Sequence, residues 1–271
     1  MKTVLITGCS SGIGEATAYY LKSKGYRVFA TARNEADVER LQNDGFEAFR
    51  IDVREPQSIT KALENIFTLT NGTLDIVFNN AGFGQPGAVE DIKTDILREQ
   101  FETNVFGLHE IMMQVLPIMK RQGYGKIINH SSVLGLVSLR LRGAYNASKY
   151  AIEGLSDTLR LELEGTNISV TVLNTGPITS NFRNNAKQKT IDNIDIENSR
   201  FKEVYHKSLN SNKSDVPFNL PPIEVAKVVE KIIKSKKNVK PRYYITKATY
   251  ILGFAKRILS TRLLDKILIK I

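Results

Sequence analysis

Short apolar runs rich in β-branched residues alternate with helical patterns along the first two thirds of the chain. Each run is long enough for one buried parallel strand, and each interval is long enough for a crossover helix. This repeated order of strand, helix and strand predicts an α/β fold, a doubly wound parallel sheet with helices on both faces. The runs are KTVLIT (2–7), YRVFAT (26–31), EAFRID (47–52), LDIVFN (74–79), GKIINH (125–130) and ISVTVLN (168–174).

The rest of the chain divides into segments of different character. Asn, Lys and Ser with isolated apolar residues fill positions 181–220, which predicts an irregular or short-helical insertion that covers a substrate. A helix is expected over 222–234, then a short apolar run, RYYIT, at 242–246. Because 271 residues are ample for one large core, we expect a single domain over 1–271 with an amphipathic extension at 247–271.

The chain carries the marks of a protein from a reducing compartment. A single cysteine, Cys9, excludes an internal disulfide framework. The N-terminal MKTVLITG lacks the long apolar stretch of a signal peptide, and no window approaches the roughly 18 consecutive apolar residues of a membrane-spanning helix. We therefore expect a cytoplasmic protein that is not integral to a membrane.

The formal net charge of +10 is concentrated at the end of the chain. Residues 227–271 hold 13 Lys and Arg against two acids, whereas residues 1–226 hold 25 against 26. This distribution argues against a broad basic face for nucleic acid. Three hypotheses stay open for the extension: packing on its own domain or a second subunit, peripheral attachment to an anionic membrane, or nucleic-acid binding. Its apolar residues at helix-like spacings are Ile251, Ile258, Leu259, Leu263, Ile267 and Ile271.

A glycine-rich turn, TGCSSGIG, follows the first predicted strand and opens a helix. Glycines at such a turn let the backbone approach a pyrophosphate, whose charge meets the unpaired amides and the positive end of the helix. The position after the first strand favours a dinucleotide site over a simple connection. The predicted cofactor-binding residues here are Gly8, Ser10, Ser11, Gly12, Ile13 and Gly14.

The ends of the second and third strands indicate which cofactor is bound. An NAD site generally places an acid after the second strand, whereas this chain has Ala32 and then Arg33, which suits a 2′-phosphate. We therefore expect NADP(H) to be preferred, with NAD(H) possible; the alternative is a solvated surface arginine. Asp52 is suited to accept from the adenine amino group, with Val53 beside it, unless the acid only caps the next helix.

Two further polar segments belong to the predicted crevice. NNAG (79–82) follows the fourth strand, where small residues and amides line a cofactor site or simply end the strand. We assign Asn80, Ala81 and Gly82 to the cofactor. Asn104 stands inside the helical pattern FETNVFG, where asparagine is a modest helix former, so a polar role is expected.

Ser132, Tyr145 and Lys149 are the candidate catalytic residues. Ser132 ends the fifth strand segment, and Tyr145 and Lys149 are four residues apart, on one face of a predicted helix. An ammonium so placed favours the phenolate and is expected to lower the pKa of Tyr145 from about 10. The tyrosine then exchanges a proton with a substrate oxygen held by Ser132, while a nicotinamide carries the hydride.

No metal site is expected. His109, His130 and His206 lack the spacing of metal ligands, and each is interpreted as a structural or surface histidine.

Taken in order, TGCSSGIG, NNAG, Asn104, Ser132 and YNASK resemble the short-chain dehydrogenase/reductase family over about residues 1–180. The resemblance implies a Rossmann-type sheet of seven parallel strands and Tyr145 as general acid/base. It also implies that Lys149 binds the nicotinamide ribose and lowers the Tyr145 pKa, that Ser132 orients the substrate oxygen, and that Asn104 holds a water of the proton relay.

The segment NTGPITSNF (174–182) looks like the part of the family that holds the nicotinamide carboxamide with backbone groups near Ile178. Two positions depart from the family pattern. Thr175 stands where proline is usual, and Ser180 stands where threonine is usual, which keeps the hydroxyl.

Within the family, the chain looks most like the branch of 17β-hydroxysteroid and retinol dehydrogenases, whose members act on lipophilic alcohols and ketones. The expected function is an NADP(H)-dependent carbonyl reductase or alcohol dehydrogenase with a small lipophilic substrate. The alternative is a catalytically silent regulator or scaffold that binds the cofactor on the same fold. Relatives commonly form dimers or tetramers, so a homo-oligomer is expected.

Overall fold

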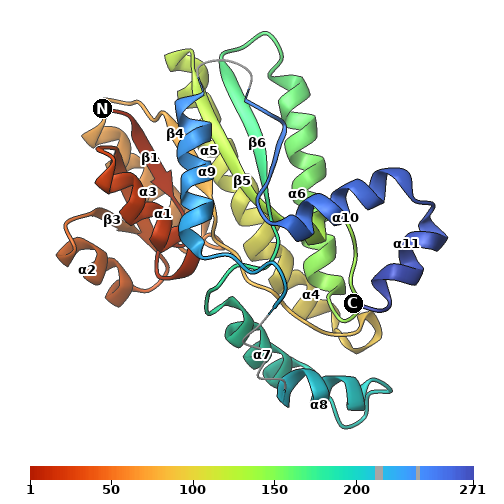
Figure 1. Ribbon diagram of the computed structural model, residues 1–271. Helices are drawn as coiled ribbons and strands as arrows, with labels where there is room; N and C mark the ends of the chain where they lie inside the picture. The colour runs from red at the N-terminus through yellow and green to blue at the C-terminus, as the bar shows by residue number, and fades with distance from the viewer. Residues whose placement is uncertain (211–215, 236–238) are drawn as a thin grey trace.

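A computed structural model describes residues 1–210, 216–235 and 239–271 of the chain (Figure 1). Its strands form one parallel sheet of seven, in the order β3-β2-β1-β4-β5-β6-β7, as expected for a doubly wound α/β fold. The strands are β1 (Thr3–Ile6), β2 (Arg27–Ala32), β3 (Glu47–Arg50), β4 (Ile76–Asn79), β5 (Gly125–Ser132), β6 (Ile168–Thr175) and β7 (Arg242–Tyr244).

Helices cover both faces of the sheet. One core cluster joins α3, α5 and α6 to the sheet, and the other joins α1, α2 and α9 to its opposite face. Apolar residues at helical spacing explain the burial: α9 buries Val225, Val229 and Ile233 at every fourth position. The helices are α1 (Gly12–Ser23), α2 (Glu35–Asn43), α3 (Pro56–Leu69), α5 (Gly107–Gln122), α6 (Gly143–Glu162) and α9 (Pro222–Lys234).

The order in which the chain adds strands reverses at the centre of the sheet, while all the strands stay parallel. β1 pairs with β2 on one side, Val4 against Val28, and with β4 on the other, Val4 against Ile76. Connections from the two sides leave in opposite directions, so a crevice forms at the carboxyl ends of β1 and β4. The glycine-rich turn and the NNAG segment follow these two strands directly, which places both predicted cofactor segments at the crevice.

Shorter elements surround the carboxyl ends of the strands. A π-helix, η2, directly follows α4 and directly precedes α5, so the three form one continuous helical segment. It contains Asn104. Two 3-10 turns flank the predicted site. The elements are α4 (Thr94–Phe101), η1 (Val89–Asp91), η2 (Glu102–Phe106) and η3 (Val133–Gly135).

The insertion predicted at 181–220 contains two regular helices, α7 (Phe182–Asn193) and α8 (Lys202–Asn210). Figure 1 shows them together at the end of the molecule away from the N-terminus. The end of the insertion lies beside the segment that follows β6, because Leu220 pairs with Ile178 in an isolated parallel bridge. Positions 211–215 of the insertion lie outside the described residues.

The C-terminal extension forms two helices, α10 (Lys247–Ile258) and α11 (Thr261–Leu268), which follow the edge strand β7. Of the apolar residues expected at helix-like spacings, Leu263 and Ile267 are exposed, and the buried side of α11 is formed by Leu264 and Leu268. The reason is a break in the helix, since Leu259 has an extended backbone and resets the helical phase. Among the described residues, no helix is both long and apolar enough to span a membrane.

Candidate active site

The glycine-rich turn between β1 and α1 has the geometry of a close backbone approach. Gly8 and Gly12 have positive φ angles, 73° and 63°, a conformation that L side chains rarely adopt. A Cβ on Gly14 would lie 2.1 Å from the carbonyl oxygen of Gly8, and one on Gly8 would lie 2.9 Å from the Cα of Ala81. Three glycines are therefore required by the structure, and no side chain caps the start of α1, whose amides suit an anion.

The NNAG segment is tied to this turn by hydrogen bonds. The amides of Asn80 and Ala81 both donate to Thr7 Oγ1 at 3.0 Å. Asn80 Nδ2 donates to the carbonyl oxygens of Thr7 at 2.9 Å and Gly8 at 3.2 Å. The side chain of Asn80 thus fixes the backbone of the glycine-rich turn through two carbonyl groups.

His130 completes this support. Because Asn80 Nδ2 already donates to two carbonyls, Asn80 Oδ1 accepts from His130 Nδ1 at 3.1 Å. Burial, aided by the charge of Lys149, lowers the pKa of His130 to about 3, so the ring is neutral. Its Nε2 then accepts from the hydroxyl of Thr175 at 3.0 Å. Of the two interpretations, a structural or a surface histidine, the structural one therefore applies to His130.

This link between β6 and the glycine-rich turn was not predicted. The one signal was Thr175, which departs from the proline usual in the family. A proline could not donate to His130, so the threonine and the histidine are explained together. The distance in sequence, 45 residues, hides the pair from any reading of local motifs.

The residues predicted for the adenosine end lie after β2 and β3. Arg33 is exposed, and it forms no hydrogen bond or ion pair with any residue that the structure describes. Ser11 is the N-cap of α1, and its side chain makes no capping hydrogen bond. Both groups are therefore available to a phosphate.

The carboxylate of Asp52 already has a partner within the protein, which was not expected. Its buried carboxylate accepts from Arg54 Nε at 3.0 Å and from Arg54 Nη2 at 2.6 Å. The hydrogen bonds from Arg54 lower the pKa of Asp52, and the charge of Arg33 acts in the same direction. Val53 is also buried, and its backbone packs on Gly107. Contact of Asp52 with an adenine stays a prediction.

Ser132, Tyr145 and Lys149 come together at the carboxyl end of β5. Tyr145 is in the first turn of α6, and Ser132, the last residue of β5, is close enough to its hydroxyl to lower the pKa of Tyr145. Ser132 Oγ also accepts from the amide of Leu134 at 3.1 Å, which fixes its rotamer. Lys149 Nζ lies 5.6 Å from the centroid of the Tyr145 ring and donates to the carbonyl of His130 at 2.7 Å.

The expectation of a lowered Tyr145 pKa is wrong for the chain by itself. Burial raises the pKa of Tyr145 to about 12, and the hydrogen bond with Ser132 opposes this only partly. Burial likewise lowers the pKa of Lys149 to about 8, against the charge of Glu153. Desolvation disfavours both charged forms, and the ammonium of Lys149 is directed at a backbone carbonyl rather than at the phenol.

Asn104 is held in the π-helix and is almost fully buried, at 1% exposure. Its Oδ1 accepts from the amide of Phe83, and its Nδ2 donates to the Phe83 carbonyl, both at 3.0 Å. Nδ2 also donates to Ser148 Oγ at 3.1 Å, and Ser148 Oγ donates to the Tyr145 carbonyl at 2.8 Å. Asn104 thus joins the turn after β4 to the first turn of α6; a role in holding water stays a prediction. Gly82 lies against it, since a Cβ there would be 3.1 Å from Asn104 Oδ1.

The segment after β6 faces the glycine-rich turn. A Cβ on Gly12 would lie 3.2 Å from the Cβ of Ser180, so the two segments are in contact. Ser180 Oγ accepts from the amide of Phe182 at 3.3 Å, and Phe182 starts α7. The rings of Phe182 and Tyr145 lie 5.6 Å apart at 60°. The insertion therefore reaches the candidate catalytic tyrosine through Phe182, a contact that sequence reasoning did not name.

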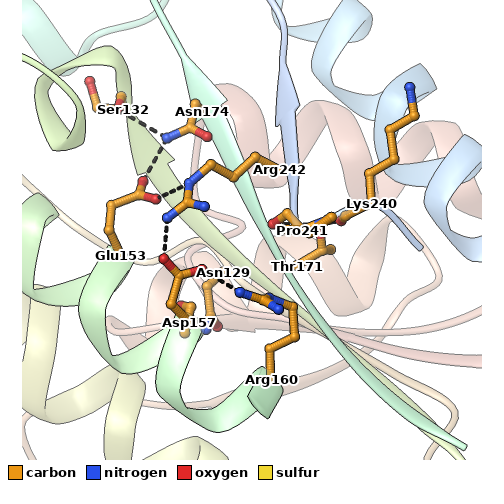
Figure 2. A network of polar contacts seen from close by, with 11 residues as sticks. Asn129, Ser132, Glu153, Asp157, Arg160, Thr171, Asn174, Lys240, Pro241 and Arg242 are labelled. Atoms are coloured by element: carbon orange, nitrogen blue, oxygen red, sulfur yellow. Dashed lines mark hydrogen bonds and ion pairs between the residues drawn. The ribbon is translucent and has the colours of Figure 1, made fainter. Parts of the chain in front are cut away.

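A polar network behind the site fastens β6 and β7 to α6 (Figure 2). Asn174 Nδ2 donates to the Ser132 carbonyl at 3.3 Å and to Glu153 Oε1 at 2.6 Å. Arg242 of β7 pairs with Glu153 at 2.8 Å and with Asp157 at 2.5 Å. The end of β5, which carries Ser132, is thus held through two side chains to the edge strand.

A groove of about 710 Å³ lies beside the site but is separate from it. Its walls are the segment 138–141, the start of α6 and the end of α11, and neither Ser132, Tyr145 nor Lys149 lines it. Asn146, Ala147 and Tyr150 line it from the face of α6 turned away from Tyr145. In the described part of the chain, no group of three or more His, Cys, Asp or Glu side chains is arranged to hold a metal.

Comparisons with known proteins agree with this geometry. A family model described as short chain dehydrogenase matches residues 2–191. The uncharacterized oxidoreductase YbbO of Escherichia coli strain K12 is 40% identical over 267 residues, 98% of this chain and 94% of that protein.

Two relatives with named substrates are more distant. A 3-ketodihydrosphingosine reductase of Bacteroides thetaiotaomicron is 32% identical over 234 residues, 86% of this chain and 84% of that one. Human 17-beta-hydroxysteroid dehydrogenase type 1 is 31% identical over 258 residues, 90% of this chain and 77% of that one.

Solved structures give the same result. A short-chain dehydrogenase from Streptomyces avermitilis superposes with a TM-score of 0.77 at 26% identity, covering 98% of this chain and 93% of that one. An actinorhodin polyketide ketoreductase solved with NADPH gives a TM-score of 0.76 at 28% identity, covering 93% and 97%.

Proposed function

Since this chain belongs to the short-chain dehydrogenase/reductase family of oxidoreductases that act on alcohols and ketones, we propose that it is an NADP(H)-dependent carbonyl reductase for a lipophilic substrate. The observation that carries the proposal is the meeting of Ser132 and Tyr145, two hydroxyls from separate elements, with Lys149 one helical turn further on. A catalytically silent cofactor binder would not need all three.

The crevice fits a dinucleotide. Gly8, Gly12 and Gly14 let the turn pack closely on itself, on Ala81 and on Ser180, at the N-terminus of a helix of 12 residues. Helix N-termini bind phosphates through free amides and the helix dipole. Bound there, a nicotinamide cofactor supplies the hydride for reduction of a carbonyl. The uncommitted side chains of Arg33 and Ser11 support the preference for NADP(H).

Tyr145 is suited to donate the proton. With a pKa of about 12 it stays protonated at neutral pH, so its hydroxyl has a proton to give to a carbonyl oxygen. Ser132, held by Leu134, offers a second hydroxyl to the same oxygen. Lys149 has a pKa of about 8 and keeps much of its positive charge at neutral pH, which favours the phenolate left after transfer.

The lipophilic substrate class rests on two observations. Phe182 packs against the Tyr145 ring, so an apolar side chain lies beside the candidate proton donor. Relatives over most of the chain are named for a ketosphingoid base and for a hydroxysteroid. Both names describe a carbonyl or alcohol on a large apolar body.

NADPH oxidation with a panel of long-chain ketones, sterol ketones and aldehydes tests the proposal. Turnover by the parent and a fall of about 100-fold or more in Tyr145→Phe are expected, because the phenol supplies the transferred proton. NADPH affinity, measured by fluorescence titration, should change little. Tyr150→Phe is the matched control, since it removes an exposed hydroxyl from the same helix. Full turnover by Tyr145→Phe would overturn the mechanism; failure of the parent on every lipophilic carbonyl would overturn the substrate class.

A further inference from the structure

Helix α10 carries large apolar residues on two sides. Leu252, Ala255 and Leu259 pack against a small core cluster that includes Leu264 and Leu268 of α11. On the other side, four large side chains are exposed to solvent. They are Tyr250 (58% exposed), Ile251 (56%), Phe254 (63%) and Ile258 (61%), named here the α10 apolar face.

These four residues form a stripe rather than a scatter. At 100° per residue, positions 250, 251, 254 and 258 fall within an arc of about 100°. Single exposed apolar residues are ordinary on a protein surface, but a contiguous set on one helix face marks an interaction surface. Further exposed apolar residues follow in and after α11: Leu263, Ile267, Ile269 and Ile271.

The surroundings of the α10 apolar face are cationic. Residues 247–271 contain six Lys and Arg and a single acid, Asp265. None of the six cations forms a salt bridge with a residue in the described ranges 1–210, 216–235 and 239–271. The cations are Lys247, Lys256, Arg257, Arg262, Lys266 and Lys270.

We propose that α10 and α11 form a peripheral binding surface for an anionic lipid bilayer. Apolar side chains on a helix bounded by unpaired cations match an interface in which acyl chains lie beneath negatively charged headgroups. The α10 apolar face inserts at the boundary of headgroups and acyl chains, and the cations contact the headgroups. The helix lies along the surface, because its other side is packed on the protein.

Two other occupants fit this surface less well. A second copy docked on the same face about a twofold axis would bring identical cations together, with only Asp265 available to pair with them. A nucleic acid would match the cations but would leave Ile251, Phe254 and Ile258 without an apolar partner. An anionic bilayer satisfies both features at once.

Vesicle flotation tests the surface with the full chain in the presence of NADPH. The probes are vesicles of phosphatidylcholine alone and of phosphatidylcholine with phosphatidylglycerol, at low salt and at about 0.5 M salt. We expect binding to the anionic vesicles that falls about tenfold at high salt. The same loss is expected when Lys256, Arg257 and Lys266 are changed to Gln.

The apolar contribution is tested separately. Changing Ile251, Phe254 and Ile258 together to Ser should lower binding to anionic vesicles at least about tenfold, with the thermal midpoint unchanged because these side chains are exposed. The matched control replaces Leu69, Tyr124 and Leu161, which are exposed elsewhere, by Ser. This control should bind vesicles as the parent does.

Three results would overturn the proposal. The first is equal flotation of the parent and the α10 triple variant. The second is a dimer in light scattering that the triple variant loses, without vesicle binding by the parent. The third is binding to duplex DNA in place of vesicles. Tyr145→Phe should float as the parent does, so a failure of the proposed reaction is distinguishable from a failure of the membrane surface.

Discussion

The proposed preference for NADP(H) over NAD(H) rests on Arg33. It stands at the end of β2, where an acid would bind the ribose of NAD, and it has no partner among the described residues. Its charge also helps to lower the pKa of Asp52, which follows β3. A 2′-phosphate on the adenosine ribose would be the natural partner of this free cation.

Arg33→Asp should therefore reverse the preference. A charge-assisted hydrogen bond contributes about 1.5–3 kcal/mol, so the KM for NADPH should rise by roughly 10- to 100-fold, while the KM for NADH falls or stays constant. Steady-state kinetics with both cofactors measure this. Arg98→Asp, an exposed arginine on α4, is the matched control. An unchanged ratio of the two KM values would mean that Arg33 is only a solvated surface residue.

His130 makes the stability of the chain depend on pH. Its pKa is about 3 in the folded chain against 6.5 for a free histidine, so the unfolded chain binds a proton that the folded chain does not. The contribution of neutral His130 to the free energy of unfolding is therefore fully present above about pH 6.5. It is lost progressively as the pH falls from there toward 3.

Urea unfolding of the parent should show a free energy of unfolding that is lower at about pH 5.5 than at about pH 7, with about 1 kcal/mol of the difference due to His130. His130→Gln should lose about 1 kcal/mol less than the parent over the same interval, whatever its absolute stability. His206→Gln is the matched control, because it removes an imidazole from the surface. Identical pH dependence of the parent and His130→Gln would show that His130 does not resist protonation in the fold.

At the scale of elements, the network on α6 holds the edge of the sheet. Glu153 is buried, and its carboxylate is shared between Asn174 of β6 and Arg242 of β7. β7 is three residues long and precedes both C-terminal helices, so Arg242 fastens the start of the extension to α6. Removing one partner of a buried ion pair leaves an uncompensated charge, which costs more than the pair itself contributes.

Arg242→Met should lower the free energy of unfolding by about 3 kcal/mol, measured by urea titration. Arg160→Met is the control within the same network. Arg160 pairs with Asp157 at 3.2 Å with both side chains about a third exposed, so its loss should cost less than about 1 kcal/mol. Equal effects of the two substitutions would mean that Glu153 finds another partner when Arg242 is removed.

For the whole molecule, the order of strands and helices was predictable because a parallel sheet buried on both faces imposes continuous apolar runs. The residues at which individual strands and helices begin and end were less predictable. β4 begins at Ile76, two residues later than its run, because Asp75 accepts from the amide and the hydroxyl of Thr3. The place of the break between α10 and α11 was not predicted, because the extended backbone of Leu259 interrupts an apolar pattern that is continuous in the sequence.

The site shows the same division. Ser132 stands at the end of β5, and Tyr145 and Lys149 are one turn apart near the start of α6, so motif spacing was enough to bring the three together. The pKa of Tyr145 was not predictable, because it depends on how much water the surrounding elements exclude. His130 with Thr175 and Phe182 with Tyr145 are contacts between distant segments that no local pattern records.

The central position of β1 has a consequence for synthesis on the ribosome. β1 needs two neighbours, and Val4 pairs with Val28 on one side but with Ile76 on the other. One edge of a buried and mostly apolar strand therefore stays open while some seventy further residues are added. Open apolar strand edges pair readily with other chains. Nascent chains that stall before β4 should be the ones that aggregate or engage chaperones.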